Sequence, residues 1–116
     1  MGARGEQTIN TPDGEVRLLY TNRALAEAEQ ATGKSVIAVC QGFVDGGSGI
    51  TEMAHLLRAG MEGARRDARA GGRPVSLTDA YDVLDQVGFE RVATAVMGGV
   101  ADVLSYDGEE SQDPNL

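Results

Sequence analysis

The stretch ITEMAHLLRAGMEGARRDA, residues 50–68, decides the fold class. Its apolar residues recur at steps of three and four, which is the period of one face of an α-helix. The residues on this face are Ile50, Met53, Ala54, Leu57, Met61 and Ala64. The pattern predicts a helix from Ile50 to about Ala68, with Gly60 and Gly63 as positions that weaken the helix and thin its surface.

Two further helices are predicted after this stretch. The residues from Ser76 to Asp79 form a capping box in which Asp replaces the usual Glu, so a helix should begin there and end at Gly88. A last helix is predicted from Phe89 to about Leu104, again with an apolar stripe.

Two helices are also predicted before residue 50. Thr21 is a suitable N-cap and Gly33 a suitable C-terminal stop for a helix over residues 22–32. A short helix should follow from Ser35 to about Val44, although its β-branched residues leave a buried strand open as an alternative. The glycine-rich residues 45–49 are then predicted to be a flexible connector.

The N-terminal part predicts a β-hairpin. Thr11-Pro-Asp-Gly14 is a turn sequence, because proline fixes its φ and glycine accepts a positive φ. Residues 6–10 and 16–20 flank this turn as two short strands. The expected fold is therefore mainly α: an N-terminal β-hairpin followed by a bundle of four or five short helices, α+β at most.

The chain is expected to form one domain over residues 6–105. Residues 1–5 should be frayed, and residues 106–116, YDGEESQDPNL, should be a disordered acidic tail.

Composition narrows the function. The net charge is −8, with 18 acidic and 10 basic residues, which disfavours binding to nucleic acid or to anionic membranes. The cluster of Arg65, Arg66, Arg69 and Arg73 is interpreted as the solvated end of a helix and the loop after it. A single cysteine indicates a reducing compartment.

The sequence contains no recognisable reaction centre. His55 and Cys40 are the only residues of their types, so zinc ligands and a catalytic triad lack partners. The carboxylates of Asp79, Asp82 and Asp85 fit a solvated helix face. We therefore expect no enzyme activity, no catalytic residue, no cofactor and no metal site. An enzyme built on His55 and Cys40, or on the three carboxylates, stays open as the least favoured hypothesis.

Two segments carry a family resemblance. Ala24-Leu25 with Glu27, Glu29 and Gly33 forms one pattern, and Leu-Leu-Arg-Ala-Gly-Met over residues 56–61 forms the other. Together with the order of hairpin and helices, they resemble the tail assembly chaperones of phages and gene transfer agents, specifically the gene-transfer-agent type. The resemblance covers about residues 15–105.

The resemblance implies a non-enzymatic protein in the cytoplasm of a bacterial host. It would bind the tape measure protein, with the tail tube protein as a second candidate partner, while a phage or gene-transfer-agent tail is assembled. Self-association stays open. The alternative is a structural component of the particle, either a head–tail connector or a tail terminator.

The candidate client-binding surface is a groove between the helices at 50–68 and 89–104. Both helices carry apolar side chains beyond one stripe, and glycines at positions 60, 63, 98 and 99 would let another backbone approach. The candidate protein-binding residues are Leu56, Gly60, Met61, Ala93, Met97 and Ala101.

Overall fold

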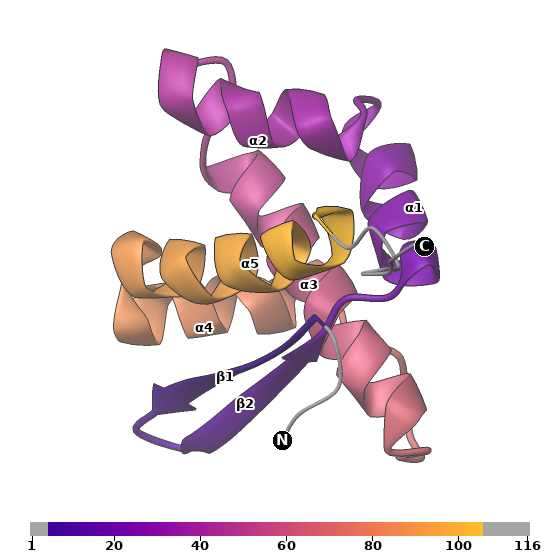
Figure 1. Cartoon of the computed structure of the whole chain (residues 1–116). Helices are drawn as coiled ribbons and strands as arrows, with labels where there is room; N and C mark the ends of the chain where they lie inside the picture. Colours follow the sequence, from indigo (N-terminus) through magenta and orange to yellow (C-terminus); the bar gives the residue numbers. More distant parts are fainter. Residues whose placement is uncertain (1–4, 106–116) are drawn as a thin grey trace, which may run out of the picture.

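An N-terminal β-hairpin followed by five helices makes up the computed structural model, which describes residues 5–105 (Figure 1). The strands are β1 (Glu6–Thr11) and β2 (Gly14–Leu19). The helices are α1 (Asn22–Thr32), α2 (Val36–Asp45), α3 (Ile50–Asp67), α4 (Leu77–Val87) and α5 (Phe89–Leu104). The predicted fold class is confirmed, and residues 36–45 form a helix rather than the alternative strand.

The described domain begins at Gly5, one residue earlier than predicted. Gly5 is buried, its N–H donates to the Asp102 carboxylate at 2.6 Å, and its carbonyl accepts from the Tyr20 N–H at 3.0 Å. Gly5 is therefore held by Asp102 of α5 and by Tyr20, the residue after β2, whereas a frayed residue was expected. Residues 1–4 and the predicted tail at 106–116 lie outside the described residues.

The turn of the hairpin is stabilised by its own polar groups. β1 and β2 pair antiparallel, with Thr11 opposite Gly14 and Ile9 opposite Val16. The Thr11 hydroxyl donates to the Gly14 carbonyl at 2.8 Å and accepts from the Asp13 N–H at 3.1 Å. Gly14 has a φ of 122°, which explains why glycine ends this turn.

Helix termini agree with the capping residues read from the sequence. The Ala24 N–H donates to the Thr21 side chain at 3.0 Å. In the capping box of α4, the Asp79 N–H donates to Ser76 Oγ at 3.2 Å and the Ser76 N–H donates to the Asp79 carboxylate at 2.9 Å. Each bond satisfies a donor that the helix itself leaves unpaired.

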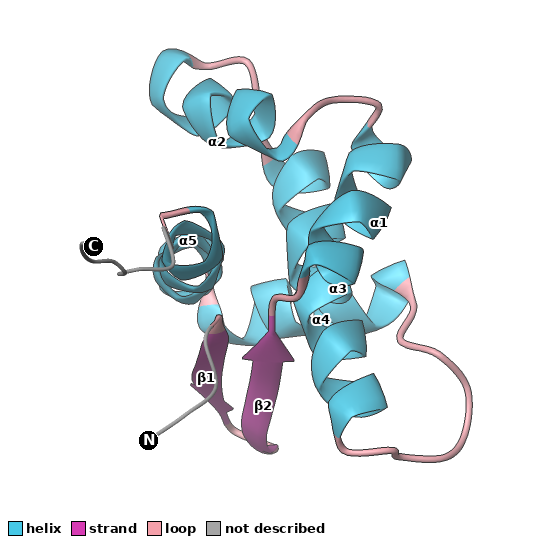
Figure 2. Cartoon of the chain, turned by 45° about the vertical axis from the view of Figure 1, so that its right-hand side comes forward, coloured by secondary structure: helices cyan, strands magenta, loops and turns pink. Residues whose placement is uncertain are grey.

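Helix α3 is the centre of the fold, since β2, α1, α4 and α5 all pack against it (Figure 2). Met53, Leu56 and Leu57 are 0% exposed, whereas Ile50 is 53% exposed. The predicted apolar face of this helix therefore omitted Leu56, which is buried, and included Ile50, which is exposed. A helix with neighbours on several sides buries a wider arc than a surface helix does.

The aromatic ring of Tyr20 fills the space between α3 and α5. Tyr20 is 1% exposed, and its hydroxyl donates to the Leu56 carbonyl at 2.8 Å. A Cβ on Gly60 would lie 2.5 Å from Tyr20 Cζ, and a Cβ on Gly99 would lie 2.7 Å from Tyr20 Cδ2. On Gly63, a Cβ would collide with the Leu19 carbonyl. The prediction that these helix glycines admit a client backbone is wrong, because the chain's own Leu19 and Tyr20 occupy the space.

Candidate protein-binding cleft

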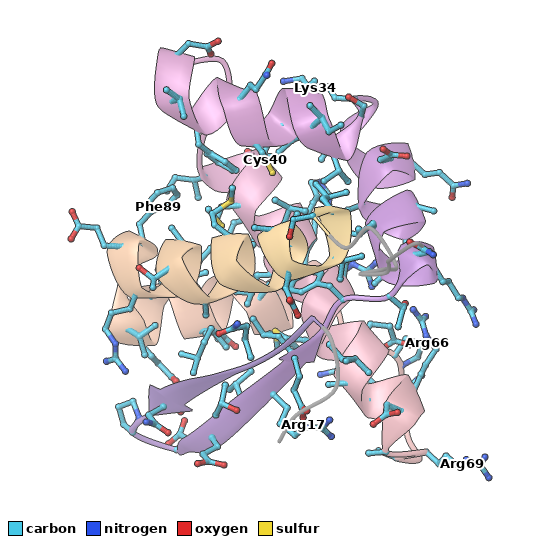
Figure 3. The ribbon with its side chains drawn as sticks, in the orientation of Figure 1. Arg17, Lys34, Cys40, Arg66, Arg69 and Phe89 are labelled. Atoms are coloured by element: carbon cyan, nitrogen blue, oxygen red, sulfur yellow. The ribbon has the colours of Figure 1, made fainter. Side chains whose placement is uncertain are left out.

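An apolar cleft of about 320 Å³ lies between α2 and α5. Its lining residues are Cys40, Met97, Val100, Ala101, Leu104 and Ser105. Helix α2 lies above α5 in both views, and the Cys40 side chain points from α2 toward α5 (Figures 2 and 3). All of these side chains except Ser105 are apolar or, in the case of Cys40, a thiol that packs as a small hydrophobe.

The apolar α2 wall follows from the composition of the helix. The sequence of α2, VIAVCQGFVD, contains no charged residue before Asp45. Val36 and Val39 face the core at 3% and 1% exposure, while Ile37 and Val44 remain 60% and 90% exposed. A helix that is apolar on both its buried and its exposed sides leaves hydrophobic surface for a partner.

The α5 wall is a row of residues one helical turn apart. Ala93, Met97 and Ala101 repeat every four residues and therefore share a face, which Leu104 extends at its end. Ala93 and Met97 are half-buried, and Ala101 and Leu104 are exposed. Val92 and Val96 are 0% exposed and anchor another side of the helix to the core, and Val100, which is 1% exposed, also lines the cleft.

A pair of aromatic rings joins the C-terminal end of α2 to the N-terminal end of α5. Phe43 of α2 and Phe89 of α5 meet edge to face, with ring centroids 6.3 Å apart and an interplanar angle of 64°. The cleft itself lies toward the other end of α5, where Leu104 and Ser105 line it. The two helices run in opposite directions (Figure 1), and the cleft borders the C-terminal half of α5, from Met97 to Ser105.

The structure divides the six sequence-predicted binding residues among three environments. Met97 and Ala101 line the cleft, and Ala93 lies one turn before Met97. Leu56 is 0% exposed, and Gly60 is buried against Tyr20. A partner cannot reach these two residues in this structure. Met61 faces a separate hollow between β2 and α3, so the six residues do not form one surface.

Sequence reasoning missed the α2 wall of the cleft. The predicted groove contained no residue of this helix, whereas Cys40 is partly buried and lines the cleft. The sequence did contain a signal for this wall. Apolar residues lie on more than one side of the short helix α2, and Ile37 and Val44 fall outside the side that it could bury against α1 and α3. That signal could have shifted the predicted groove from α3 and α5 to α2 and α5.

The polar groups considered for catalysis do not converge. Burial raises the pKa of the Cys40 thiol, which disfavours the thiolate that a nucleophile requires. Arg73 and the Ser76 N–H hold the Asp79 carboxylate and lower its pKa to about 2. Among residues 5–105, no group of three His, Cys, Asp or Glu side chains could hold a metal ion. No helix in this range is long and apolar enough to cross a membrane.

Three of the four clustered arginines are held by carboxylates. Arg65 and Arg66 bind the buried Glu62 at 2.7 Å and 3.5 Å, and Arg66 also binds Glu27 at 3.2 Å. Arg73 binds Asp79 at 3.0 Å. Interpreting this cluster as simply solvated was wrong for Arg65 and Arg66, whose side chains are 23% and 24% exposed.

Comparison with known proteins places the chain in a tail-related family. No curated protein and no solved structure matches it. Residues 4–99 match the family described as phage tail tube protein, GTA-gp10. The match supports a tail-related protein of a phage or gene transfer agent, whereas its description names a tail tube rather than an assembly chaperone. Since the match spans most of the 116 residues, the chain belongs to the phage tail tube protein, GTA-gp10 family.

Proposed function

We propose that this protein is a non-enzymatic tail assembly chaperone that binds the tape measure protein in the cytoplasm of the bacterial host. The observation that carries the proposal is the apolar cleft between α2 and α5, together with the exposed Ile37 and Val44 beside it. Helical clients commonly insert an apolar face into such a groove between two helices. A tape measure protein, being long and helical, offers many such faces.

The distribution of exposed apolar residues also supports a chaperone. Among the described residues, four of the six large apolar side chains that remain exposed belong to α2 and α5, namely Ile37, Val44, Phe89 and Leu104. A tube subunit needs two complementary interfaces, because heterologous contacts build rings and stacks only when each subunit binds on both sides. A single apolar region fits one client better than two neighbours.

The second candidate is a structural component of the tail, and the family description favours it. A tail tube subunit is the most direct reading of that description, and a head–tail connector or tail terminator belongs to the same class. Under this alternative, the cleft would bind another component of the finished particle. The tail tube protein also remains a second candidate client of a chaperone.

The two candidates differ in where the protein is found. We expect the full chain to co-purify with the tape measure protein when both are expressed together, and to be absent from purified particles by mass spectrometry. Stoichiometric presence in the particle, without co-purification of the tape measure protein, would establish the structural alternative.

A further inference from the structure

We propose that the α2–α5 surface pairs with itself when no client is bound, so that two copies of the chain form a dimer with two-fold symmetry. The inference concerns the surface proposed for the client, but it does not depend on the chaperone function. Its basis is the arrangement of apolar residues on the two helices that border the cleft.

The α2 side of this surface is an apolar ridge. Cys40 lies three residues after Ile37 and four residues before Val44, so the three side chains share one face of the helix. Cys40 lines the cleft, whereas Ile37 and Val44 are 60% and 90% exposed. Two large aliphatic side chains therefore project from α2 beside the cleft.

The α5 side is a second apolar ridge. Met97, Ala101 and Leu104 are separated by four and three residues, and all three line the cleft. Between this ridge and Cys40 lies the apolar hollow of about 320 Å³. One face of the molecule therefore carries a protrusion, at Ile37 and Val44, beside a hollow of the same apolar chemistry.

A protrusion beside a matching hollow is what a two-fold interface requires. In such an interface the same patch contacts itself, so each copy must carry both the inserted and the receiving part. A half-turn about an axis between the two copies would place the α2 ridge of each copy over the cleft of the other. Ridges of side chains on one helix commonly pack into grooves of another in this way.

Like charges do not oppose this pairing within the two ridges. Helix α2 carries no charged residue over positions 36–44, and α5 carries none over positions 92–101. Asp102, the next residue of α5, accepts from the Gly5 N–H at the start of the hairpin. An uncharged patch that pairs with itself avoids both the repulsion between like charges and the cost of desolvating them.

A second copy is favoured because the rest of the described chain leaves this ridge uncovered. Helix α2 lies at one extremity of the molecule in both views and packs chiefly against α1 (Figures 1 and 2). No element within residues 5–105 covers Ile37 or Val44. Monomeric soluble proteins rarely expose contiguous large apolar side chains, and pairing with a second copy would cover them until a client arrives.

Sedimentation of the full chain over a range of concentrations measures the pairing, and we expect a reversible monomer–dimer equilibrium. Val44→Lys puts a charge on the α2 ridge and Ala101→Lys puts one on the α5 ridge, so each should weaken dimerisation about tenfold or more. Both positions are exposed, so both variants should fold, which circular dichroism checks. Ala70→Lys makes the same change in the exposed loop after α3 and should leave the equilibrium unchanged.

Cys40 gives a second measurement, because it is the only cysteine in the chain and it lies between Ile37 and Val44 on the α2 ridge. Pairing would cover its thiol, so alkylation by iodoacetamide should slow as the protein concentration rises. In Val44→Lys the alkylation rate should not depend on concentration. The concentration dependence is compared rather than the absolute rate, since a lysine one turn away can itself change the reactivity of the thiol.

Three results would overturn the proposal. The first is a chain that stays monomeric at every concentration. The second is a dimer that either ridge substitution leaves intact, because such a dimer is made by another face. The third is assembly into larger species only, which would show a head-to-tail contact instead of a two-fold one, since heterologous contacts build rings or open filaments.

The tape measure protein separates this inference from the chaperone function. If it binds a chain that is monomeric when free, the dimer is wrong and the chaperone function stands. If the free chain is a dimer that Val44→Lys and Ala101→Lys both weaken, and the tape measure protein never binds, the dimer stands and the chaperone function is wrong.

Discussion

The ring of Tyr20 lies directly against the Cα of Gly99, so that a Cβ at position 99 would sit 2.7 Å from Tyr20 Cδ2 and 3.1 Å from the Gly5 carbonyl oxygen. The adjacent Gly98 differs, because the nearest atom to its Cβ would be Gln7 Nε2 at 3.2 Å. That atom is the end of a flexible side chain. Two consecutive glycines in the middle of α5 therefore have different reasons to be there.

Gly99→Ala should destabilise the protein by about 1–3 kcal/mol, because the added methyl group overpacks a site bounded by a buried ring and a backbone carbonyl. Gly98→Ala should be neutral or stabilising by up to about 1 kcal/mol, because alanine favours the helix and Gln7 can move. Urea unfolding of both variants measures the difference. Equal effects of the two substitutions would mean that Tyr20 does not constrain α5 as described.

Local signals in the sequence predicted the elements well. The turn at Thr11–Gly14 and the capping box of Ser76 and Asp79 are set by bonds between neighbouring residues, and the structure contains them. Such features depend on chemistry within four residues, which a single sequence displays in full.

The candidate site was harder to predict, because it depends on which element covers which face. Periodicity showed that α3 and α5 are apolar on more than one side, but it could not show that Tyr20 fills the space between them. Leu56 and Gly60 were therefore assigned to a partner although the chain's own core contains them. Met97 and Ala101 were placed on an accessible face, and the opposite wall, α2, was overlooked.

Leu57→Ala should lower the free energy of unfolding by about 2–5 kcal/mol, because Leu57 is 0% exposed in the central helix. Its control is Val44→Ala, which removes apolar atoms at a position that is 90% exposed and should change stability by less than about 0.5 kcal/mol. A loss below about 1 kcal/mol for Leu57→Ala would contradict its position in the core.

Stability should fall in acid partly because of Glu62. Its carboxylate accepts from Arg65 at 2.8 Å and from the Val75 N–H at 2.9 Å, and Arg65 chiefly lowers the pKa of Glu62 from 4.5 to about 2. A depressed folded-state pKa stabilises the protein above the unfolded-state value, and this contribution disappears as the pH falls from 4.5 toward 2. Urea midpoints at neutral and acidic pH measure the loss.

Glu62→Gln tests the same network at neutral pH. The substitution removes the charge that Arg65 and Arg66 bind, so we expect a loss of roughly 1.5–3 kcal/mol. The variant should also show a weaker loss of stability in acid than the parent protein. Asp79→Asn is the comparison variant. The pKa of Asp79 is also lowered to about 2, but by Arg73 and Ser76, which are not part of the Glu62 network. An unchanged acid profile in Glu62→Gln would show that Glu62 does not set it.

Phe89→Ala should loosen α2 without unfolding the rest of the domain. Phe89 is the ring of α5 that meets Phe43 of α2, and such pairs contribute about 0.5–1.5 kcal/mol beyond the area they bury. Losing about 1 kcal/mol should speed amide hydrogen exchange in α2 roughly fivefold, while α3 stays protected.

Tyr81→Ala is the matched control, since Tyr81 is an aromatic residue of α4 with the same exposure of 36%. Equal acceleration in α2 and α3 would instead show that Phe89 supports the whole fold rather than the contact between α2 and α5.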